Sequence, residues 1–165
     1  MKLRLIAALA VVVLVAVGFF ILADKPAAPE VSVVTLQGER LDIATLRGKV
    51  VLVNFWATTC STCIAEMPKL IATHEKYQPQ GLETLAIAMD YDPPEQVRAF
   101  TERNALPFVV APDTHGAAAQ AFGGVRLTPT TFLIDKQGRI QKKYLGEPNF
   151  DELNALLEKL LAEAA

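Results

Sequence analysis

The feature that most constrains the fold is an apolar segment that ends shortly before a pair of cysteines. Residues 50–55 read Val-Val-Leu-Val-Asn-Phe, so that Asn54 is their only polar member. A strand without alternation of polar and apolar residues is buried on both faces, which requires helices on both sides of its sheet. Cys60 and Cys63 follow, where the pattern changes to that of a helix over 61–77. We therefore expect an α/β protein in which the cysteines open a helix.

The other segments alternate between the two kinds of pattern. We predict further strands at 84–89, 108–111, 131–135 and 139–144, and further helices at 93–104, 117–122 and 150–162. Residues 31–36 and 39–41 flank Gln37-Gly38 and predict an N-terminal β-hairpin. This order, β-α-β-α followed by a hairpin and a helix, predicts a central mixed sheet flanked by helices on both faces.

An uncharged apolar run of 19 residues, 5–23, follows Lys2 and Arg4. As a helix it would span roughly 28 Å, close to the thickness of a bilayer core, which favours an uncleaved transmembrane anchor. A cleaved signal peptide is the alternative, although its apolar region is usually only about 7–15 residues long. Lys2 and Arg4 place residues 1–4 in the cytoplasm. Both interpretations export the rest of the chain.

The exported part is expected to be one domain. Residues 24–30 contain two prolines and predict a linker, and residues 31–165 suffice for a single core. With a single-pass anchor in a bacterial inner membrane, this domain would face the periplasm, where disulfides persist. The net charge of −2 and the lack of a basic run argue against nucleic acid as a partner.

Cys60 and Cys63 have the spacing of a redox pair. Cys60 is predicted at the helix N-cap, where unpaired amides and the helix dipole stabilise a thiolate. Cys63 follows one turn later on the same face, where its thiol can expel a mixed disulfide. A purely structural disulfide would gain little from closing so short a loop. A zinc site needs about four ligands, and the chain offers only His74 and His115 besides the cysteines.

Longer motifs around these cysteines resemble a known family. The matching segments are Gly48-Lys49-Val50-Val51-Leu52-Val53-Asn54-Phe55-Trp56-Ala57-Thr58 before the pair, Glu66-Met67-Pro68 after it, Thr128-Pro129-Thr130-Thr131-Phe132-Leu133-Ile134-Asp135, and Gly138. Together they are similar to the TlpA-like branch of the thioredoxin superfamily, which includes the membrane-anchored ResA-type reductases. The resemblance covers residues 31–161. It implies a thioredoxin fold with Pro129 in the cis form, facing the cysteine pair.

Three residues are predicted to form the substrate-binding side of this site. With Pro129 in the cis form, the Thr128 backbone would be free to pair with an extended substrate chain. From the residues alone, a trans proline that simply opens the next strand fits equally well. Trp56 is expected beside the disulfide, although an ordinary core tryptophan would give the same pattern.

The site departs from the family pattern in two places. Thr59 stands where an aromatic residue usually precedes the first cysteine, and Ser61 and Thr62 replace two prolines between the cysteines. Hydroxyl groups near the sulfurs can stabilise a thiolate, which would make the pair more oxidising.

A proton acceptor must also be found, because Asn54 occupies the position of the buried aspartate of thioredoxin. Glu66 and Asp90 are the candidates for a proton relay, Asp90 because it ends the neighbouring strand. For each of them, a solvated surface carboxylate is the simpler interpretation. His74 and His115 are likewise interpreted as surface residues.

The resulting hypothesis is a membrane-anchored thiol–disulfide oxidoreductase with Cys60 as nucleophile and Cys63 as resolving thiol. Its substrates would be disulfides in exported proteins, such as an apocytochrome c. An upstream membrane thiol reductase would supply electrons, and neither a diffusible cofactor nor a metal is implied.

Two rival functions use the same residues. A thiol peroxidase of the peroxiredoxin type carries threonine three residues before its reactive cysteine, where this chain has Ala57. A copper-binding assembly factor would use Cys60 and Cys63 with a histidine, and His115 could reach them only through folding.

Overall fold

The computed structural model describes residues 25–164. Its elements are β1 (Ser32–Val34), β2 (Arg40–Asp42), η1 (Ile43–Leu46), β3 (Val50–Trp56), α2 (Ser61–Tyr77), η2 (Gln78–Gln80), β4 (Leu82–Ala88), α3 (Pro94–Arg103), β5 (Val109–Pro112), α4 (Ala117–Ala121), β6 (Thr130–Ile134), β7 (Ile140–Leu145) and α5 (Phe150–Ala162). Every predicted strand and helix within this range is present. The two short 3-10 helices, η1 and η2, were not predicted.

The central sheet has five strands in the order β5-β4-β3-β6-β7. The middle strand, β3, pairs parallel with β4 and antiparallel with β6. All seven residues of β3 are buried. The mixed sheet that the order of the elements predicted is therefore confirmed. So is the strand buried on both faces that residues 50–55 predicted.

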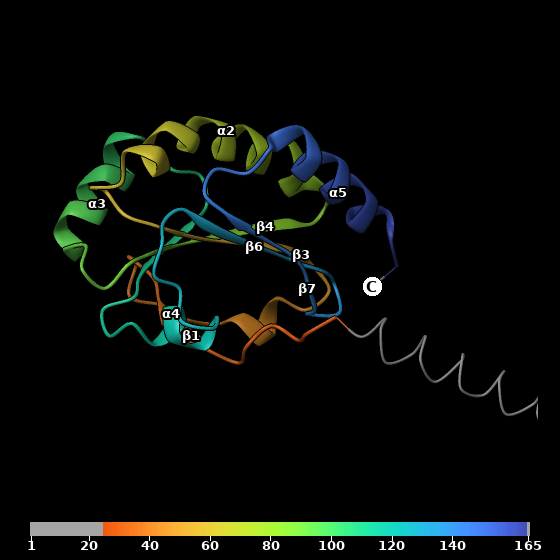
Figure 1. Cartoon of the computed structure of the whole chain (residues 1–165), viewed down its shortest axis with the longest axis horizontal. Helices are drawn as coiled ribbons and strands as arrows, with labels where there is room; N and C mark the ends of the chain where they lie inside the picture. Colours follow the sequence, from red (N-terminus) through yellow and green to blue (C-terminus); the bar gives the residue numbers. More distant parts are fainter. Residues whose placement is uncertain (1–24, 165) are drawn as a thin grey trace, which may run out of the picture.

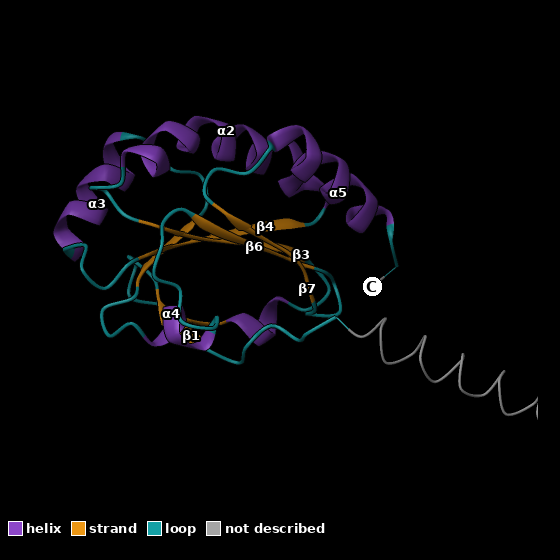
Figure 2. Cartoon of the chain, in the orientation of Figure 1, coloured by secondary structure: helices purple, strands orange, loops and turns teal. Residues whose placement is uncertain are grey.

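Helices cover both faces of this sheet (Figure 1). On one face lie α2, α3 and α5, and on the other lie α4, η1 and the β1–β2 hairpin. Figure 2 shows the strands as a middle layer between these two groups. The apolar residues of β3 therefore pack in two directions, with Leu52 and Trp56 on the side of α2 and α5, and Val53 and Phe55 on the side of α4. Because strand residues alternate between faces, Asn54 lies on the side of α2.

The N-terminal hairpin is formed as expected, with Val33 opposite Leu41. The predicted linker is 24–30, and its described part, 25–30, makes backbone hydrogen bonds to the domain. The Ala28 amide donates to the carbonyl of Gly138, and the Ile140 amide donates to the carbonyl of Pro26, both at 2.8 Å. This proline-containing segment thus supplies backbone partners to the first residue of the edge strand β7 and to the turn before it.

The predicted anchor, 5–23, and the predicted cytoplasmic residues 1–4 lie outside the described residues. Between residues 25 and 164, no helix is both long enough and apolar enough to cross a membrane.

Candidate active site

Cys60 lies at the N-cap of α2, as its position in the sequence predicted. The chain leaves β3 after Trp56 and turns sharply, with the Cys60 amide donating to the carbonyl of Ala57 at 3.1 Å. The Cys60 sulfur accepts a hydrogen bond from the Cys63 amide at 3.2 Å and so caps the helix. An amide in this position stabilises a thiolate.

The two cysteines form a disulfide and differ sharply in exposure. Their Cα atoms are 5.2 Å apart. Cys63 is completely buried, whereas Cys60 is only partly buried. A sulfur atom of another protein can therefore react with Cys60 only. Cys63 can react only with Cys60.

Thr128 and Pro129 lie beside this pair, in the loop that leads directly into β6. Their peptide bond is cis, the form that the family resemblance implied. The carbonyl oxygen of Thr128 lies 3.6 Å from the Cys60 sulfur. Its side-chain hydroxyl lies 3.3 Å from the hydroxyl of Tyr91, a residue that the sequence analysis did not single out. The structure therefore brings Cys60, Cys63, Thr128 and Pro129 together, although 68 positions separate Cys60 from Thr128.

Glu66 is not a surface residue, so the simpler interpretation of this carboxylate was wrong. Its side chain is buried, with 1% exposure, three residues beyond Cys63 on the inner face of α2. The Asn54 side-chain amide donates to Glu66 Oε1 at 2.9 Å and also contacts Thr131 Oγ1 at 2.9 Å. Glu66 Oε2 has no hydrogen-bond partner among the described residues. One carboxylate oxygen is thus anchored and the other is free to carry a proton.

The environment of Glu66 shifts the ionisation of its carboxyl group towards neutral pH. Burial raises the pKa of the Glu66 carboxyl from 4.5 to about 7. The hydrogen bond from Asn54 acts in the opposite direction, Glu147 raises the pKa further, and Lys69 lowers it. Near neutral pH this group can therefore both accept and release a proton.

The other predicted residues are placed differently. Trp56 is fully buried in the same hydrophobic cluster as Cys63, with its ring centroid 5.2 Å from that of Phe100. Trp56 is thus part of the apolar packing that surrounds Cys63, and with no exposed surface it cannot itself contact a substrate in this structure. Asp90 is exposed, and its carboxylate lies beside Gly116 on the loop before α4.

The two histidines differ from each other in exposure. His115 is exposed as expected, whereas His74 is buried at 5% exposure, so its interpretation as a surface residue was wrong. His74 Nδ1 lies 3.1 Å from Thr84 Oγ1, and burial lowers the pKa of this histidine. Within residues 25–164, no three His, Cys, Asp or Glu side chains form a group that could hold a metal ion.

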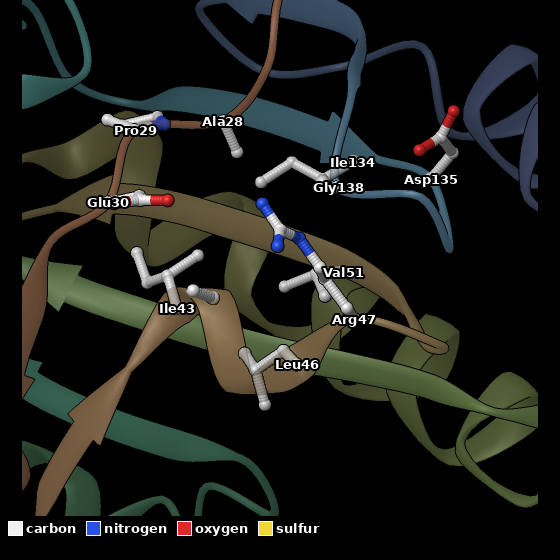
Figure 3. Close-up of a pocket in the computed structure, with 11 residues that line it drawn as sticks. Ala28, Pro29, Glu30, Ile43, Leu46, Arg47, Val51, Ile134, Asp135 and Gly138 are labelled. Atoms are coloured by element: carbon white, nitrogen blue, oxygen red, sulfur yellow. The ribbon is translucent and has the colours of Figure 1, made fainter.

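A pocket elsewhere in the domain offers no second active site. It lies between the segment at Ala28, helix η1 and the end of β6, around Ile43, Val51 and Ile134 (Figure 3). These three apolar residues belong to the core on the side of α4, opposite the face that holds Cys63. The cavity volume of about 20 Å³ has room for only about one water molecule.

The family model described as Redoxin matches residues 22–157. The chain belongs to the Redoxin family. It is 37% identical over 150 residues to a thiol-disulfide oxidoreductase ResA of Bacillus cereus, covering 87% of this chain and 84% of that protein. It is 32% identical over 163 residues to the ResA of Geobacillus kaustophilus, covering 93% and 92% of the two chains.

The fold is also shared with a solved structure. The thiol:disulfide interchange protein of Chlorobium tepidum TLS, a thioredoxin family protein, superposes with a TM-score of 0.76 at 26% identity, over 85% of this chain and 99% of that one. The thioredoxin fold is therefore confirmed. Together with the Cys60–Cys63 disulfide at the start of α2, the family relationship makes this chain a thiol–disulfide oxidoreductase.

Sequence reasoning missed two further groups at the site. Asn54 was seen only as a residue unable to take a proton, yet its amide positions the Glu66 carboxylate. Asp92 was not considered, although it contacts the loop directly before Cys60. Both interactions join segments distant in sequence, and no local pattern signals such contacts.

Proposed function

We propose that this oxidoreductase works as a reductase, donating electrons from Cys60 and Cys63 to disulfides in exported proteins. The observation that carries this direction is the environment of Cys63. This sulfur is completely buried in an apolar cluster, and the carboxyl group of Glu66 follows it one helical turn later. Burial and a neighbouring carboxylate both disfavour a thiolate. A dithiol whose reduced form is poorly stabilised is a good electron donor.

In the proposed reaction, Cys60 attacks first because only its sulfur is reachable from solvent. The Cys60 thiolate displaces one sulfur of the substrate disulfide, which leaves as a thiolate, and a mixed disulfide forms. Cys63 then attacks the Cys60 sulfur and releases the second substrate thiolate. The electron pair ends on the substrate, and the enzyme is left with the Cys60–Cys63 disulfide.

Glu66 is proposed as the proton acceptor for the second step. Cys63 must lose its proton before it can attack, and no solvent reaches it. Residues three apart on a helix are neighbours, so that Glu66 lies on the same face one turn below Cys63. With a pKa of about 7 and an unpartnered oxygen, Glu66 can take this proton and later release it. Asp90, which is exposed beside Gly116, is the weaker of the two original candidates.

Thr128 and Pro129 are proposed to bind the substrate chain. The Thr128 carbonyl lies beside the Cys60 sulfur, at the point where an incoming polypeptide would pass. An extended chain can use such a backbone group for pairing.

The cellular setting is proposed from the N-terminal sequence. The apolar run 5–23 behind Lys2 and Arg4 supports a single-pass anchor in a bacterial inner membrane, with the catalytic domain in the periplasm. An upstream membrane thiol reductase would return the Cys60–Cys63 disulfide to the dithiol form. A disulfide in an apocytochrome c is a substrate of the proposed class.

Protease protection tests this setting. In spheroplasts that express the full chain, we expect protease added from outside to digest the domain, while the intact protein sediments with the membrane. Release of the domain into the periplasmic fraction would instead show a cleaved signal peptide. Digestion that begins only after the membrane is permeabilised would contradict export altogether.

A further inference from the structure

A buried carboxylate holds the loop that precedes Cys60. Asp92 lies between β4 and α3 and is only 3% exposed. Its Oδ2 accepts the backbone amide of Thr58, and its Oδ1 accepts the Thr58 hydroxyl, both at 2.6 Å. The two hydrogen bonds join segments 34 positions apart in the sequence. Hydrogen bonds to a carboxylate are among the stronger ones in proteins.

Thr58 lies inside the turn that delivers Cys60 to the helix. This turn is closed by the hydrogen bond from the Cys60 amide to the Ala57 carbonyl, at 3.1 Å. At its start, the Trp56 carbonyl accepts the Met89 amide at 3.0 Å, which ties the end of β3 to the end of β4. Asp92 then fixes the middle of the turn, so the backbone before Cys60 is held at successive points by the segment that follows β4.

The residue next to Asp92 contacts the other side of the site. The Tyr91 hydroxyl lies 3.3 Å from the Thr128 hydroxyl, and the Thr128 carbonyl lies 3.6 Å from the Cys60 sulfur. Two consecutive residues therefore touch both loops that flank Cys60. Asp92 lies against the loop that carries the sulfur, and Tyr91 lies against the loop that faces it.

We propose that Asp92, through its paired hydrogen bonds to Thr58, is a positioning residue that sets the reactivity of Cys60. By fixing the turn, it holds the Cys60 sulfur where the Cys63 amide, at 3.2 Å, can stabilise a thiolate. Asp92 does not touch the reacting sulfur and acts only through Thr58. The inference requires only that Cys60 is the attacking thiol, and it holds whatever the natural substrate or cellular location.

The negative charge of Asp92 and its hydrogen bonds to Thr58 would have opposite effects on the stability of the Cys60 thiolate. If Asp92 acted only as a nearby negative charge, removing the charge would favour the Cys60 thiolate. If it acts by holding the turn, breaking either hydrogen bond would move the sulfur away from the amide and disfavour the thiolate. Thr58→Val breaks the hydroxyl bond and keeps the charge. Asp92→Asn removes the charge and turns both charged hydrogen bonds into weaker neutral ones, because the asparagine amide can donate to the Thr58 hydroxyl.

The test is the pH profile of Cys60 alkylation by iodoacetamide in the full chain, in a Cys63→Ser background where Cys60 is the only thiol. We expect Thr58→Val to slow alkylation at pH 7 by about 5- to 10-fold, the effect of losing about one ordinary hydrogen bond. Asp92→Asn, whose hydrogen bonds are weakened to about half their strength, should slow it by about 2- to 3-fold. Thr58→Ser keeps both hydrogen bonds and should retain the parent profile.

Asp113→Asn provides a matched control. Asp113 is also a buried carboxylate, and it accepts two amides of α4, from Ala118 at 3.1 Å and Ala119 at 2.8 Å. It follows the edge strand β5, two strands away from β3. We expect this variant to lower the melting temperature and leave the alkylation profile unchanged. Faster alkylation in Asp92→Asn with no change in Thr58→Val would overturn the proposal, as would unchanged profiles in both or an equal shift in Asp113→Asn.

Discussion

Replacing Cys60 with serine is expected to abolish disulfide reduction, whereas replacing Cys63 with serine is expected to trap the enzyme on its substrate. The difference follows from exposure, because Cys60 is reachable and Cys63 is completely buried. Without Cys60 there is no accessible nucleophile, and we expect the rate to fall by a factor on the order of 10⁴. Without Cys63 the first displacement still proceeds, but the mixed disulfide has no resolving thiol.

A suitable substrate is an oxidised peptide with the sequence Cys-x-x-Cys-His, the haem attachment motif of c-type cytochromes. Its reduction is followed by mass spectrometry of acid-quenched samples. Ser61→Ala, which changes an exposed residue between the cysteines, serves as the control and should keep most of the activity. A peptide adduct on Cys63 of the Cys60→Ser variant would show that the roles are reversed.

Glu66→Gln is expected to stabilise the protein at neutral pH and to slow its catalysis. Because the folded-state pKa of about 7 exceeds the ordinary 4.5, the folded protein binds a proton more tightly than the unfolded chain does. The stability that Glu66 contributes is therefore complete below about pH 4.5 and is lost as the pH rises through 7. This pKa shift corresponds to a loss of about 3 kcal/mol in folding stability at high pH. Glutamine stays neutral at every pH, so the variant does not have this loss. Glutamine also keeps the acceptor oxygen that Asn54 contacts.

The stability test is the difference in the free energy of unfolding between wild type and Glu66→Gln, measured by urea denaturation across pH 4–8. We expect the free energy of unfolding of the variant to increase, relative to that of the wild type, as the pH rises from 4 to 8. Glu83→Gln removes a surface ion pair with Lys49 and should change stability by less than about 1 kcal/mol at any pH. A pH-independent difference for Glu66→Gln would contradict the raised pKa.

The catalytic test is the decay of the mixed disulfide. If Glu66 accepts the Cys63 proton, Glu66→Gln should slow this step by about 10²-fold, the lower end of the range for general base catalysis. The inflection near pH 7 should disappear from its pH profile. Unchanged decay would remove Glu66 from the mechanism and leave the roles of the cysteines intact.

The position of the cysteines could be predicted because it depends on local patterns. The apolar residues 50–55 predicted the central strand, and the change of periodicity at residue 61 predicted the start of α2. The burial of Glu66 and His74 was missed, since glutamate is mostly exposed in proteins and histidine is buried only some of the time. A signal was present, because the buried residues of α2 recur every three or four positions: Cys63, Glu66, Met67, Leu70, Thr73, His74 and Tyr77.

Other parts of the site depend on contacts that only folding creates. Asp90 was a candidate because it follows β4, but it is Asp92, two residues further on, whose carboxylate turns inward to Thr58. The conformation of a loop decides this, and no periodicity describes a loop. Likewise, Asn54 and Thr131 meet across paired strands, 77 positions apart in the chain.

The hydroxyl residues that replace the usual family pattern bear on the direction of electron flow. Thr59, Ser61 and Thr62 are all exposed to solvent, where water competes for their hydroxyl groups. The buried carboxyl of Glu66 near Cys63 acts in the opposite sense to any thiolate stabilisation they provide. We expect the buried group to dominate, because its interactions are not screened by water.

The reduction potential of the Cys60–Cys63 couple, measured by equilibration with glutathione buffers, tests the proposed direction most directly. We predict a value more negative than about −200 mV, within the range spanned by glutaredoxins and by thioredoxin at about −270 mV. Such a couple can donate electrons to the disulfides of exported proteins. A potential near −120 mV, as in the oxidant DsbA, would show that the protein forms disulfides, and it would contradict the reductase assignment.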